Sequence, residues 1–492
     1  MKKITFPTPY TILFVVIFLA AALTYVLPSG KYDTLLYDKQ RDLFVIQSID
    51  TTYTVEATQE SLERRGIGIS LSKFKEQKIK KPISIPNTYK SQEAPGQGIL
   101  EVIYAPIKGI YDTIEVILFV LFLGGFIGVF NSSGVLNQGV GYLAHRFKGR
   151  EGILIIVLTT LMALGGTSFG MAEESLAFYP MLVPIFLAAG YDMMVPLAVI
   201  LVGINVGTLA STVNPFAVII ASDAAGVDWT AGIIIRLVAL GLCLVIGILY
   251  VIRYAEIVRK HPERSLVKGI TIPEIYQNHS HIQVTHLSLG VKLQLTIFAL
   301  TFVIMIIGVS QWEWWFLEMT ALFLVSSVVI AFVQRVGEKP FVRHFLTGAC
   351  DLLGVAFIIG IARGVSIILN EGQISDTLLY YATNMVGGMS PMVFLPVLML
   401  VFAVLSFFIA SSSGMAVLTM PIIGALASVV GVEGQSVVNA YLFGMGIMGF
   451  VTPTGVILPS LAMVNINYNQ WLKFSWPLIL IYSVVLTILL WL

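Results

Sequence analysis

Polar, glycine-containing breaks interrupt apolar sequence at matching places in the two halves of this chain. In the first half they are 167–174 (TSFGMAEE) and 211–215 (STVNP), and in the second half 411–416 (SSSGMA) and 452–455 (TPTG). At membrane depth, irregular backbone is tolerated only where protein buries it or water reaches it. Helix N-termini at such breaks favour anions, and unwound carbonyls favour cations such as Na⁺. Two matched pairs of breaks therefore predict a secondary transporter with its site near the middle of the bilayer.

Short oxygen-bearing side chains inside the breaks are the first candidate ligands. They are Ser168, Ser211, Thr212, Asn214, Ser411, Ser412, Ser413, Thr452 and Thr454. The alternative is that each hydroxyl bonds a carbonyl of its own helix or permits close helix packing. For a single residue the two interpretations are equally well supported. The four clusters taken together favour the interpretation that these side chains bind a substrate or an ion.

Two adjacent acids follow the first break. A charged side chain at the bilayer centre costs about 2.5–3.5 kcal/mol on insertion scales, so Glu173 and Glu174 need a reason to be there. The second half has Val417 and Leu418 instead. Mutual repulsion favours protonation of one acid, which would suit proton coupling, and helical geometry predicts that only one of them faces the site. The alternative is a structural ion pair with a buried arginine.

Arg363 is the natural partner, because it lies in the middle of an apolar segment. It could pair with either glutamate or bind a substrate carboxylate, and the sequence leaves both roles open. Arg236 lies near the end of its segment, where it can extend toward water, and a structural role is expected. Cys243 and Cys350 occur in no metal or redox spacing and are expected to be buried hydrophobes.

Enzymatic chemistry is not supported. Residues 166–170 match the G-x-S-x-G pattern, but that pattern requires a strand-to-helix elbow and a histidine partner, and all six histidines lie in expected loops. Neither a zinc-protease motif nor a P-loop is present. The net charge of +1 gives no reason to expect nucleic acid. We expect no enzyme and no cofactor, with Na⁺ or H⁺ as the coupling ion.

Composition and hydropathy supply the elements that position these residues. The chain is 57% hydrophobic and only 12% charged, about half the charge of a soluble domain. A spanning helix needs about 20 apolar residues. We predict an all-α protein with nine spans, near 10–27, 112–131, 194–222, 230–252, 291–309, 314–333, 345–368, 437–466 and 474–491. Two interrupted stretches, 153–190 and 391–430, are predicted to be re-entrant hairpins.

The distribution of lysine and arginine predicts the topology. Short loops on one side hold the basic residues and those on the other side hold none, which places the N-terminus in the cytoplasm and the C-terminus outside. The first segment resembles a signal peptide, but its length and its counterpart at 314–333 favour a helix. Under this topology the halves run in opposite directions, as inverted repeats. We predict a multi-pass protein of the inner membrane.

The predicted organisation has six parts. They are the first helix (1–27), an extracytoplasmic insert (28–108), the first repeat with its hairpin and broken helix (109–252), a cytoplasmic linker (253–290), a connecting helix (291–309) and the second repeat (314–492). The insert is interpreted as a small cap, with substrate capture as the alternative. His279, His281 and His286 in the linker are assigned to a solvated loop rather than a metal site.

At these motifs the chain resembles the YfcC-like membrane proteins, which carry the provisional description of basic amino-acid antiporters. These are related to the DcuC anaerobic C4-dicarboxylate carriers of the ion transporter superfamily. The resemblance rests on 170–178 (GMAEESLAF), 214–216 (NPF), 411–414 (SSSG), 418–421 (LTMP) and 453–454 (PT), and on the opening 7–30 segment. It covers nearly the whole chain.

The resemblance implies hairpins and broken helices in a homodimer that moves like an elevator, with ion and substrate at the hairpin tips. The resemblance maps this site onto residues of the breaks, namely Thr167, Ser168, Ser211, Thr212, Asn214, Ser411, Ser412, Ser413, Thr452 and Thr454. With Glu173, Glu174 and Arg363 added from the argument on charged residues, the predicted substrate residues are Thr167, Ser168, Glu173, Glu174, Asn214, Arg363, Ser411, Ser412, Ser413, Thr452 and Thr454. The predicted ion residues are Ser168, Ser211, Thr212, Asn214, Ser413 and Thr454. The Ser-Asn-Thr tip of the dicarboxylate relatives is absent, which weakens both the dicarboxylate and the Na⁺ assignments.

These observations predict a transporter of small organic solutes, with a basic amino acid as the leading substrate. Glu173 or Glu174 would pair with its cationic group, and Arg363 or the hairpin N-termini with its carboxylate. The alternative is a C4-dicarboxylate carrier in which the acids handle protons. A channel or sensor is a third class, disfavoured because neither needs matched breaks.

Overall fold

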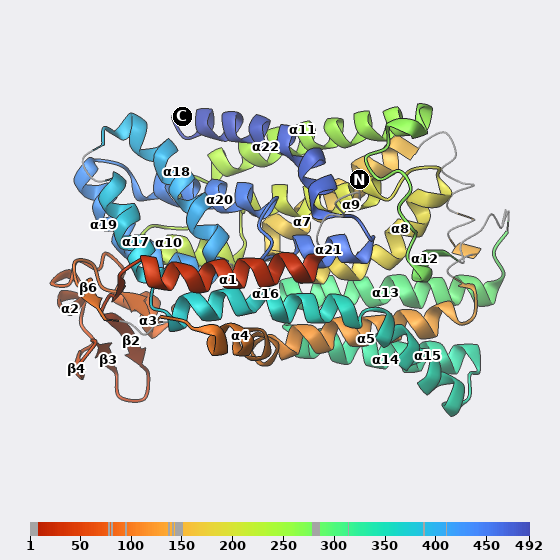
Figure 1. Cartoon of the computed structure of the whole chain (residues 1–492), viewed down its shortest axis with the longest axis horizontal. Helices are drawn as coiled ribbons and strands as arrows, with labels where there is room; N and C mark the ends of the chain where they lie inside the picture. The colour runs from red at the N-terminus through yellow and green to blue at the C-terminus, as the bar shows by residue number, and fades with distance from the viewer. Residues whose placement is uncertain are drawn as a thin grey trace.

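The chain is a polytopic α-helical membrane protein, as the sequence predicts. The computed structural model describes residues 8–76, 79, 82–93, 96–135, 138–139, 142, 151–277, 286–312, 314–386, 389–409 and 411–492. Within these residues, eight helices are long and apolar enough to cross a membrane. They are α1 (Pro9–Val26), α5 (Ile114–Asn131), α7 (Glu151–Phe169), α11 (Ile233–Lys260), α13 (Leu289–Gln311), α14 (Phe316–Gln334), α16 (Leu353–Glu371) and α22 (Tyr468–Leu489) (Figure 1).

The remaining helices complete the two halves. The other α-helices are α2 (Gln59–Glu63), α3 (Leu71–Lys75), α4 (Ile99–Asp112), α8 (Tyr179–Ala188), α9 (Met194–Leu209), α10 (Ile220–Ala224), α12 (Glu274–Gln277), α15 (Glu338–Asp351), α17 (Ser375–Val386), α18 (Pro391–Phe408), α19 (Ser412–Val430), α20 (Gly434–Gly449) and α21 (Ile457–Met463). The short irregular helices are η1 (Glu173–Phe178), η2 (Pro215–Ile219) and η3 (Pro262–Arg264).

The helices interrupt where the sequence predicts breaks. The predicted span 194–222 consists of α9, a break and then η2 with α10, and 437–466 consists of α20 and α21. The predicted hairpins correspond to α7 with η1 and α8, and to α18 with α19. The prediction for 345–368 is wrong at its start, because α15 ends at Asp351 and α16 begins at Leu353.

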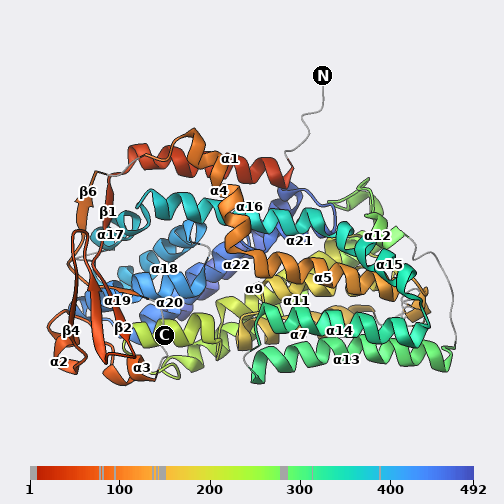
Figure 2. The same cartoon turned by 90° about the horizontal axis from the view of Figure 1, so that it is seen from below.

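The two halves make reciprocal contacts. Helix α4 packs on α16 while α5 packs on α15, and α7 packs on α9 as α18 packs on α20 (Figure 2). Glycines allow the first two approaches: Gly109 of α4 lies against the backbone of Gly364 in α16, and Gly348 of α15 lies against Gly128 in α5. A side chain at either Gly109 or Gly348 would collide with the facing backbone. This reciprocity is the arrangement expected of inverted repeats.

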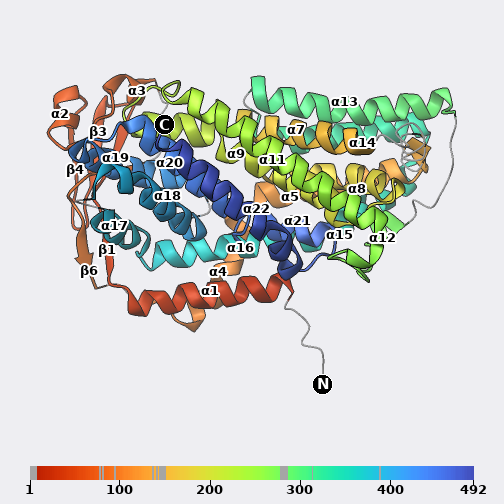
Figure 3. The same ribbon diagram turned by 90° about the horizontal axis from the view of Figure 1, so that it is seen from above.

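The described residues between 28 and 93 build a small domain, the cap, at one end of the helical body (Figures 1 and 3). Its antiparallel sheet has the order β4-β3-β2-β5, and a separate pair joins β1 to β6. The strands are β1 (Ser29–Lys31), β2 (Thr34–Asp38), β3 (Leu43–Gln47), β4 (Thr52–Glu56), β5 (Ile83–Ser84) and β6 (Lys90–Gln92). Val417 of α19 is buried in the same cluster as Leu35 and Phe44 of the cap. The cap therefore rests on the second hairpin.

An ion pair fastens the cap to the first repeat as well. Lys73 Nζ of α3 lies 2.6 Å from Oδ1 of Asp223 in α10, and the Asp223 side chain is 1% exposed. Removing one partner of a buried pair leaves the other charge uncompensated. We expect Lys73→Met to destabilise the protein by about 3 kcal/mol, the lower end for buried pairs because the lysine is partly exposed. Thermal melting of the purified protein in detergent measures this effect.

Lys75 of the same helix supplies the matched control. Its Nζ lies 3.3 Å from Oδ2 of Asp42, and both side chains are about half exposed. Exposed pairs contribute about 0–1 kcal/mol, so Lys75→Met should barely change the melting temperature. Equal losses in the two variants would contradict a fastening role for Lys73.

Candidate functional site

A cavity of about 410 Å³ lies where the breaks of the two repeats meet, and we call it the central cavity. Its walls come from the first hairpin tip (169–174), the second hairpin tip (411–413) and the break 454–456 between α20 and α21. The start of α5 and the middle of α16 close the remaining sides. Segments that are far apart in sequence therefore converge on one site, as the paired breaks predict.

Thr167 joins the first hairpin tip to the break after α9. Its Oγ1 donates to the carbonyl of Ala210 at 2.8 Å, and it accepts a hydrogen bond from the Thr212 amide at 3.0 Å. Asn214 caps the next helical turn, because its Oδ1 accepts from the amides of Phe216 (2.9 Å) and Ala217 (3.3 Å). Thr167, Thr212 and Asn214 are all buried. These side chains hold the break in place.

Gly170 lets the first hairpin turn beside that cap. Its φ is +75°, a conformation that residues with a Cβ rarely adopt. A Cβ at this position would also meet the side-chain amide of Asn214 at 2.7 Å. The glycine is thus required both by the turn and by the close approach of Asn214.

Two predicted ligands of the first repeat use their hydroxyls locally. Ser168 Oγ donates to the carbonyl of Leu164 at 2.5 Å, and Ser211 Oγ donates to that of Thr208 at 2.7 Å. This is the helix-bonding alternative considered from the sequence. Among the described residues that line the central cavity, Thr167, Ser168, Ser211, Thr212, Asn214 and Thr452 are absent. A ligand role for these six stays a prediction.

The second hairpin tip faces the cavity more directly. Ser411, Ser412 and Ser413 line it, and Ser411 Oγ accepts from the Gly414 amide at 3.1 Å in the first turn of α19. Ser412 Oγ donates to the carbonyl of Phe216 at 3.4 Å, which joins the two repeats. Thr454 also lines the cavity, and its Oγ1 lies 2.8 Å from that of Thr452. The hydroxyls of the second repeat thus face the central cavity, whereas those of the first repeat bond carbonyls of the first repeat itself.

Both glutamates line the central cavity. The expectation that only one of them faces the site is therefore wrong: both stand at the start of η1, where the turn of the first hairpin faces the cavity. Glu173 is partly exposed, whereas Glu174 is 7% exposed. Oε2 of Glu174 accepts from the amide of Ala172 at 2.9 Å, which fixes that carboxylate against the hairpin turn.

Arg363 projects from α16, but its ion-pair partner is not one of the two predicted glutamates. Its Nε pairs with Oδ2 of Asp112 at the end of α4, while its charge acts on Glu173 across the cavity. The sequence interpretation missed Asp112, and it also missed Glu115 on the first turn of α5. Acids at the end of an apolar segment are usual at the membrane interface, so no sequence signal marked them. With these two residues, the described cavity wall holds four carboxyl groups and one guanidinium.

Aromatic side chains line the central cavity beside its carboxyl groups. Phe216 and Trp315 both line the cavity, with ring centroids 5.1 Å apart. The face of an indole ring attracts cations. Trp315 was not predicted as a site residue, because a tryptophan before a span is usual at a membrane interface.

Arg236 has the predicted structural role but does not reach water. It is fully buried, and its guanidinium donates to the carbonyls of Trp229 and Ala231 and to Oδ1 of Asn439 (3.3 Å) in α20. Because these two carbonyls lie just before the start of α11, the guanidinium of Arg236 finds acceptors without extending to the membrane surface.

No cluster of three or more His, Cys, Asp or Glu residues that could hold a metal ion occurs in the part of the chain described by the structure. His286 is described, whereas His279 and His281 lie outside the described residues. None of the linker residues that the structure describes lines the central cavity.

Comparison with known proteins places the chain in a family. The family model described as "DcuC: C4-dicarboxylate anaerobic carrier" matches residues 6–492. The chain belongs to this family. It is 41% identical over 484 residues to an "Uncharacterized protein" of Haemophilus influenzae, an alignment covering 97% of this chain and 95% of the relative. It is 29% identical over 372 residues to the Escherichia coli protein named "Putative basic amino acid antiporter YfcC", covering 73% of each.

Two solved transporter structures are similar over most of their length but only at a TM-score of 0.40. Neisseria gonorrhoeae MtrF, described as one of a class of antimetabolite efflux pumps, is 13% identical and covers 99% of this chain and 95% of its own. The YdaH transporter of Alcanivorax borkumensis is 14% identical, with 98% of each chain covered. The family assignment makes the DcuC-related chain a member of a membrane transporter family, independently of these two structures.

Proposed function

We propose that this DcuC-family protein is a secondary active transporter that moves basic amino acids by antiport or with a coupling ion. The main support for this proposal is the charge of the central cavity, which is lined by four carboxyl groups and one guanidinium. An amino acid with a cationic side chain would place that group among Glu173, Glu174 and Trp315 and its carboxylate on Arg363. The name of the Escherichia coli relative supports the same substrate class.

A C4-dicarboxylate is the second candidate, favoured by the description of the family model. Arg363 would then bind a substrate carboxylate, and Glu173 and Glu174 would carry protons. The charge of the cavity opposes this assignment, because Asp112 and Glu115 add two further acids that a dianion must approach.

Several features of the transport cycle are part of the proposal. We place the protein in the inner membrane with a cytoplasmic N-terminus, as a homodimer with Na⁺ or H⁺ as coupling ion. The strong asymmetry of basic residues supports the orientation. The reciprocal packing of the two repeats supports alternating access around the central cavity.

Counterflow in proteoliposomes tests the substrate class. Vesicles are loaded in turn with arginine, ornithine, a neutral amino acid, succinate or fumarate, and uptake of the labelled compound is followed. We expect labelled arginine or ornithine to accumulate only against an internal basic amino acid. Accumulation driven only by dicarboxylates would replace the leading substrate assignment with the second candidate. Voltage-driven current without saturable counterflow would instead indicate a channel.

A further inference from the structure

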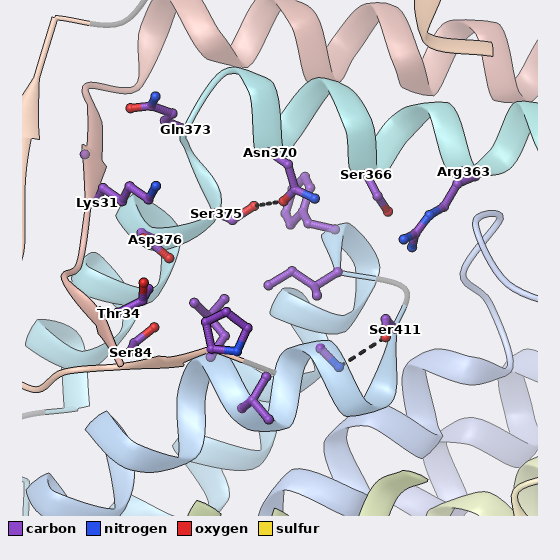
Figure 4. Close-up of a pocket in the computed structure, with 17 residues that line it drawn as sticks. Lys31, Thr34, Ser84, Arg363, Ser366, Asn370, Gln373, Ser375, Asp376 and Ser411 are labelled. Carbon is purple, nitrogen blue, oxygen red and sulfur yellow. Dashed lines mark hydrogen bonds between the residues drawn. The ribbon is translucent and has the colours of Figure 1, made fainter. Parts of the chain in front are cut away.

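A second cavity of about 450 Å³ lies beneath the cap, and we call it the vestibule. Figure 4 shows its three walls: cap residues such as Lys31 and Thr34, the side of α16 with the start of α17, and the second hairpin with Ser411. The same hairpin lines the central cavity from its other side. The vestibule is therefore placed between the cap and the proposed substrate site.

Helix α16 turns a polar track toward the vestibule. Arg363, Ser366 and Asn370 line it at helical spacing on one face, and Gln373 extends the track just beyond the end of the helix at Glu371 (Figure 4). At a rise of 1.5 Å per residue, the helical part of the track, from Arg363 to Asn370, is about 10 Å long. Polar side chains along one face of a membrane helix need a partner or water, because an unsatisfied group there is costly.

Two atoms on this track lack such a partner. Ser366 is 7% exposed, and its Oγ has no hydrogen-bond partner among the described residues. Oε1 of Gln373, at the outer end of the track, is likewise buried without one. Buried polar groups are normally hydrogen-bonded, so these two atoms have unused capacity to bond a polar group that enters the cavity.

Arg363 and Ser411 belong to both cavities, which makes them the boundary between the two. Within the described part of the chain, the guanidinium of Arg363 makes its one hydrogen bond through Nε to Asp112. Its terminal nitrogens are therefore available, and two parallel N–H groups match a carboxylate. Ser366 lies one helical turn away on the same face, within reach of a ligand held by Arg363.

The outer end of the vestibule has balanced charge. Asp376 accepts from the amide of Tyr32 at 3.0 Å, and the charge of Lys31 acts on it. This end therefore offers no net attraction for an anion, and the strongest carboxylate ligand of the vestibule is Arg363 at the inner end.

We propose that the vestibule is a second binding site, in which Arg363 and Ser366 hold the carboxylate of an incoming amino acid before it enters the central cavity. The inference rests on the proposed amino-acid transport and adds a capture step that operates only from the side of the cap. Arg363 acts in both cavities, whereas Ser366 lines the vestibule alone. Ser366 is therefore the residue whose replacement separates the two sites.

The test compares transport from the two sides of the membrane. Arginine uptake is measured in right-side-out and inside-out vesicles for the wild type and for Ser366→Ala. Loss of one hydrogen bond predicts a KM for arginine about two- to tenfold higher when arginine is on the cap side. The maximal rate from the cap side and the KM from the opposite side should stay unchanged. The maximal rate from the opposite side should fall by the same factor, because a substitution cannot alter the transport equilibrium.

Ser475→Ala is the matched control, because Ser475 Oγ in α22 is also buried without a partner but lines neither cavity. Its two KM values should equal those of the wild type. An unchanged KM for Ser366→Ala, or an equal rise from both sides, overturns the vestibular site while leaving the proposed function intact. A wild type that carries no amino acid from either side contradicts the proposed function itself, and the vestibular proposal with it.

A labelling experiment gives a readout independent of transport. Ser366→Cys is made in a chain that also carries Cys350→Ser. The expectation of two buried cysteines is wrong for Cys350, which is exposed, whereas Cys243 is buried. A small membrane-impermeant thiol reagent added on the cap side should modify Cys at 366 slowly, because the position is 7% exposed and lines only the vestibule, and arginine should slow this reaction severalfold further. Modification at the same rate with and without arginine would contradict binding at this position.

Discussion

Replacing Arg363 with alanine is expected to lower arginine counterflow by about 10- to 100-fold. A hydrogen bond to a charged group contributes about 1.5–3 kcal/mol, and each 1.4 kcal/mol is a factor of ten in affinity. Arg363 is the one cation in the described wall of the central cavity, where it faces four carboxyl groups. Its loss removes the group that fits a substrate carboxylate and leaves the acids without compensation. Counterflow of labelled arginine at a series of concentrations measures the change in KM.

Two further variants separate a binding role for Arg363 from a structural one. Arg363→Lys keeps the charge but loses the planar pair of donors, so an intermediate KM is expected. Asp112→Asn breaks the ion pair while leaving the guanidinium in place. The pair is partly exposed on both sides, so its loss should change stability little. If Asp112→Asn removes counterflow as completely as Arg363→Ala and also lowers the melting temperature, Arg363 serves the ion pair and not the substrate.

Hydropathy was sufficient to locate the long elements of the fold. A span such as α5 is a continuous apolar run, and a break such as 211–215 combines polar residues with proline. Both can therefore be recognised from a short stretch of sequence without knowledge of the rest of the chain. The amphipathic helices α4, α15 and α17 were not predicted. Each is 12–14 residues long and has a polar face, which makes it hard to distinguish from loop sequence beside a span.

Apart from Arg363, the sequence predicted only those site residues that lie within the breaks. The three serines of the second hairpin tip and Glu173 line the central cavity because they belong to the breaks themselves. The pairing of Arg363 with Asp112 was not predictable, because the partners are 251 residues apart and meet only through the packing of α4 on α16. The same holds for Lys73 and Asp223, which join the cap to the first repeat. Such contacts depend on how the repeats dock, which composition and periodicity do not encode.

Neutralising both glutamates together is expected to lower arginine affinity by about 10- to 100-fold, because each carboxylate that contacts the cationic group contributes a charge-assisted interaction. The variant is Glu173→Gln with Glu174→Gln. Glutamine keeps the shape of the side chain, and its Oε1 can still accept from the amide of Ala172. Binding of labelled arginine to the purified protein measures the effect without requiring translocation.

The same variant discriminates between the two substrate classes. For a basic amino acid, binding itself is lost, because the cationic group loses its partners. For a dicarboxylate carrier, succinate binding persists or strengthens as repulsion in the cavity falls, and the pH dependence of transport changes instead. Glu263→Gln is the control, since Glu263 is exposed in η3 beside His261 and lines neither cavity. Unchanged arginine affinity in the double variant, with Glu263→Gln also unchanged, would show that the acidic wall does not recognise the cation. The central cavity would then lose the observation on which the basic amino acid assignment depends.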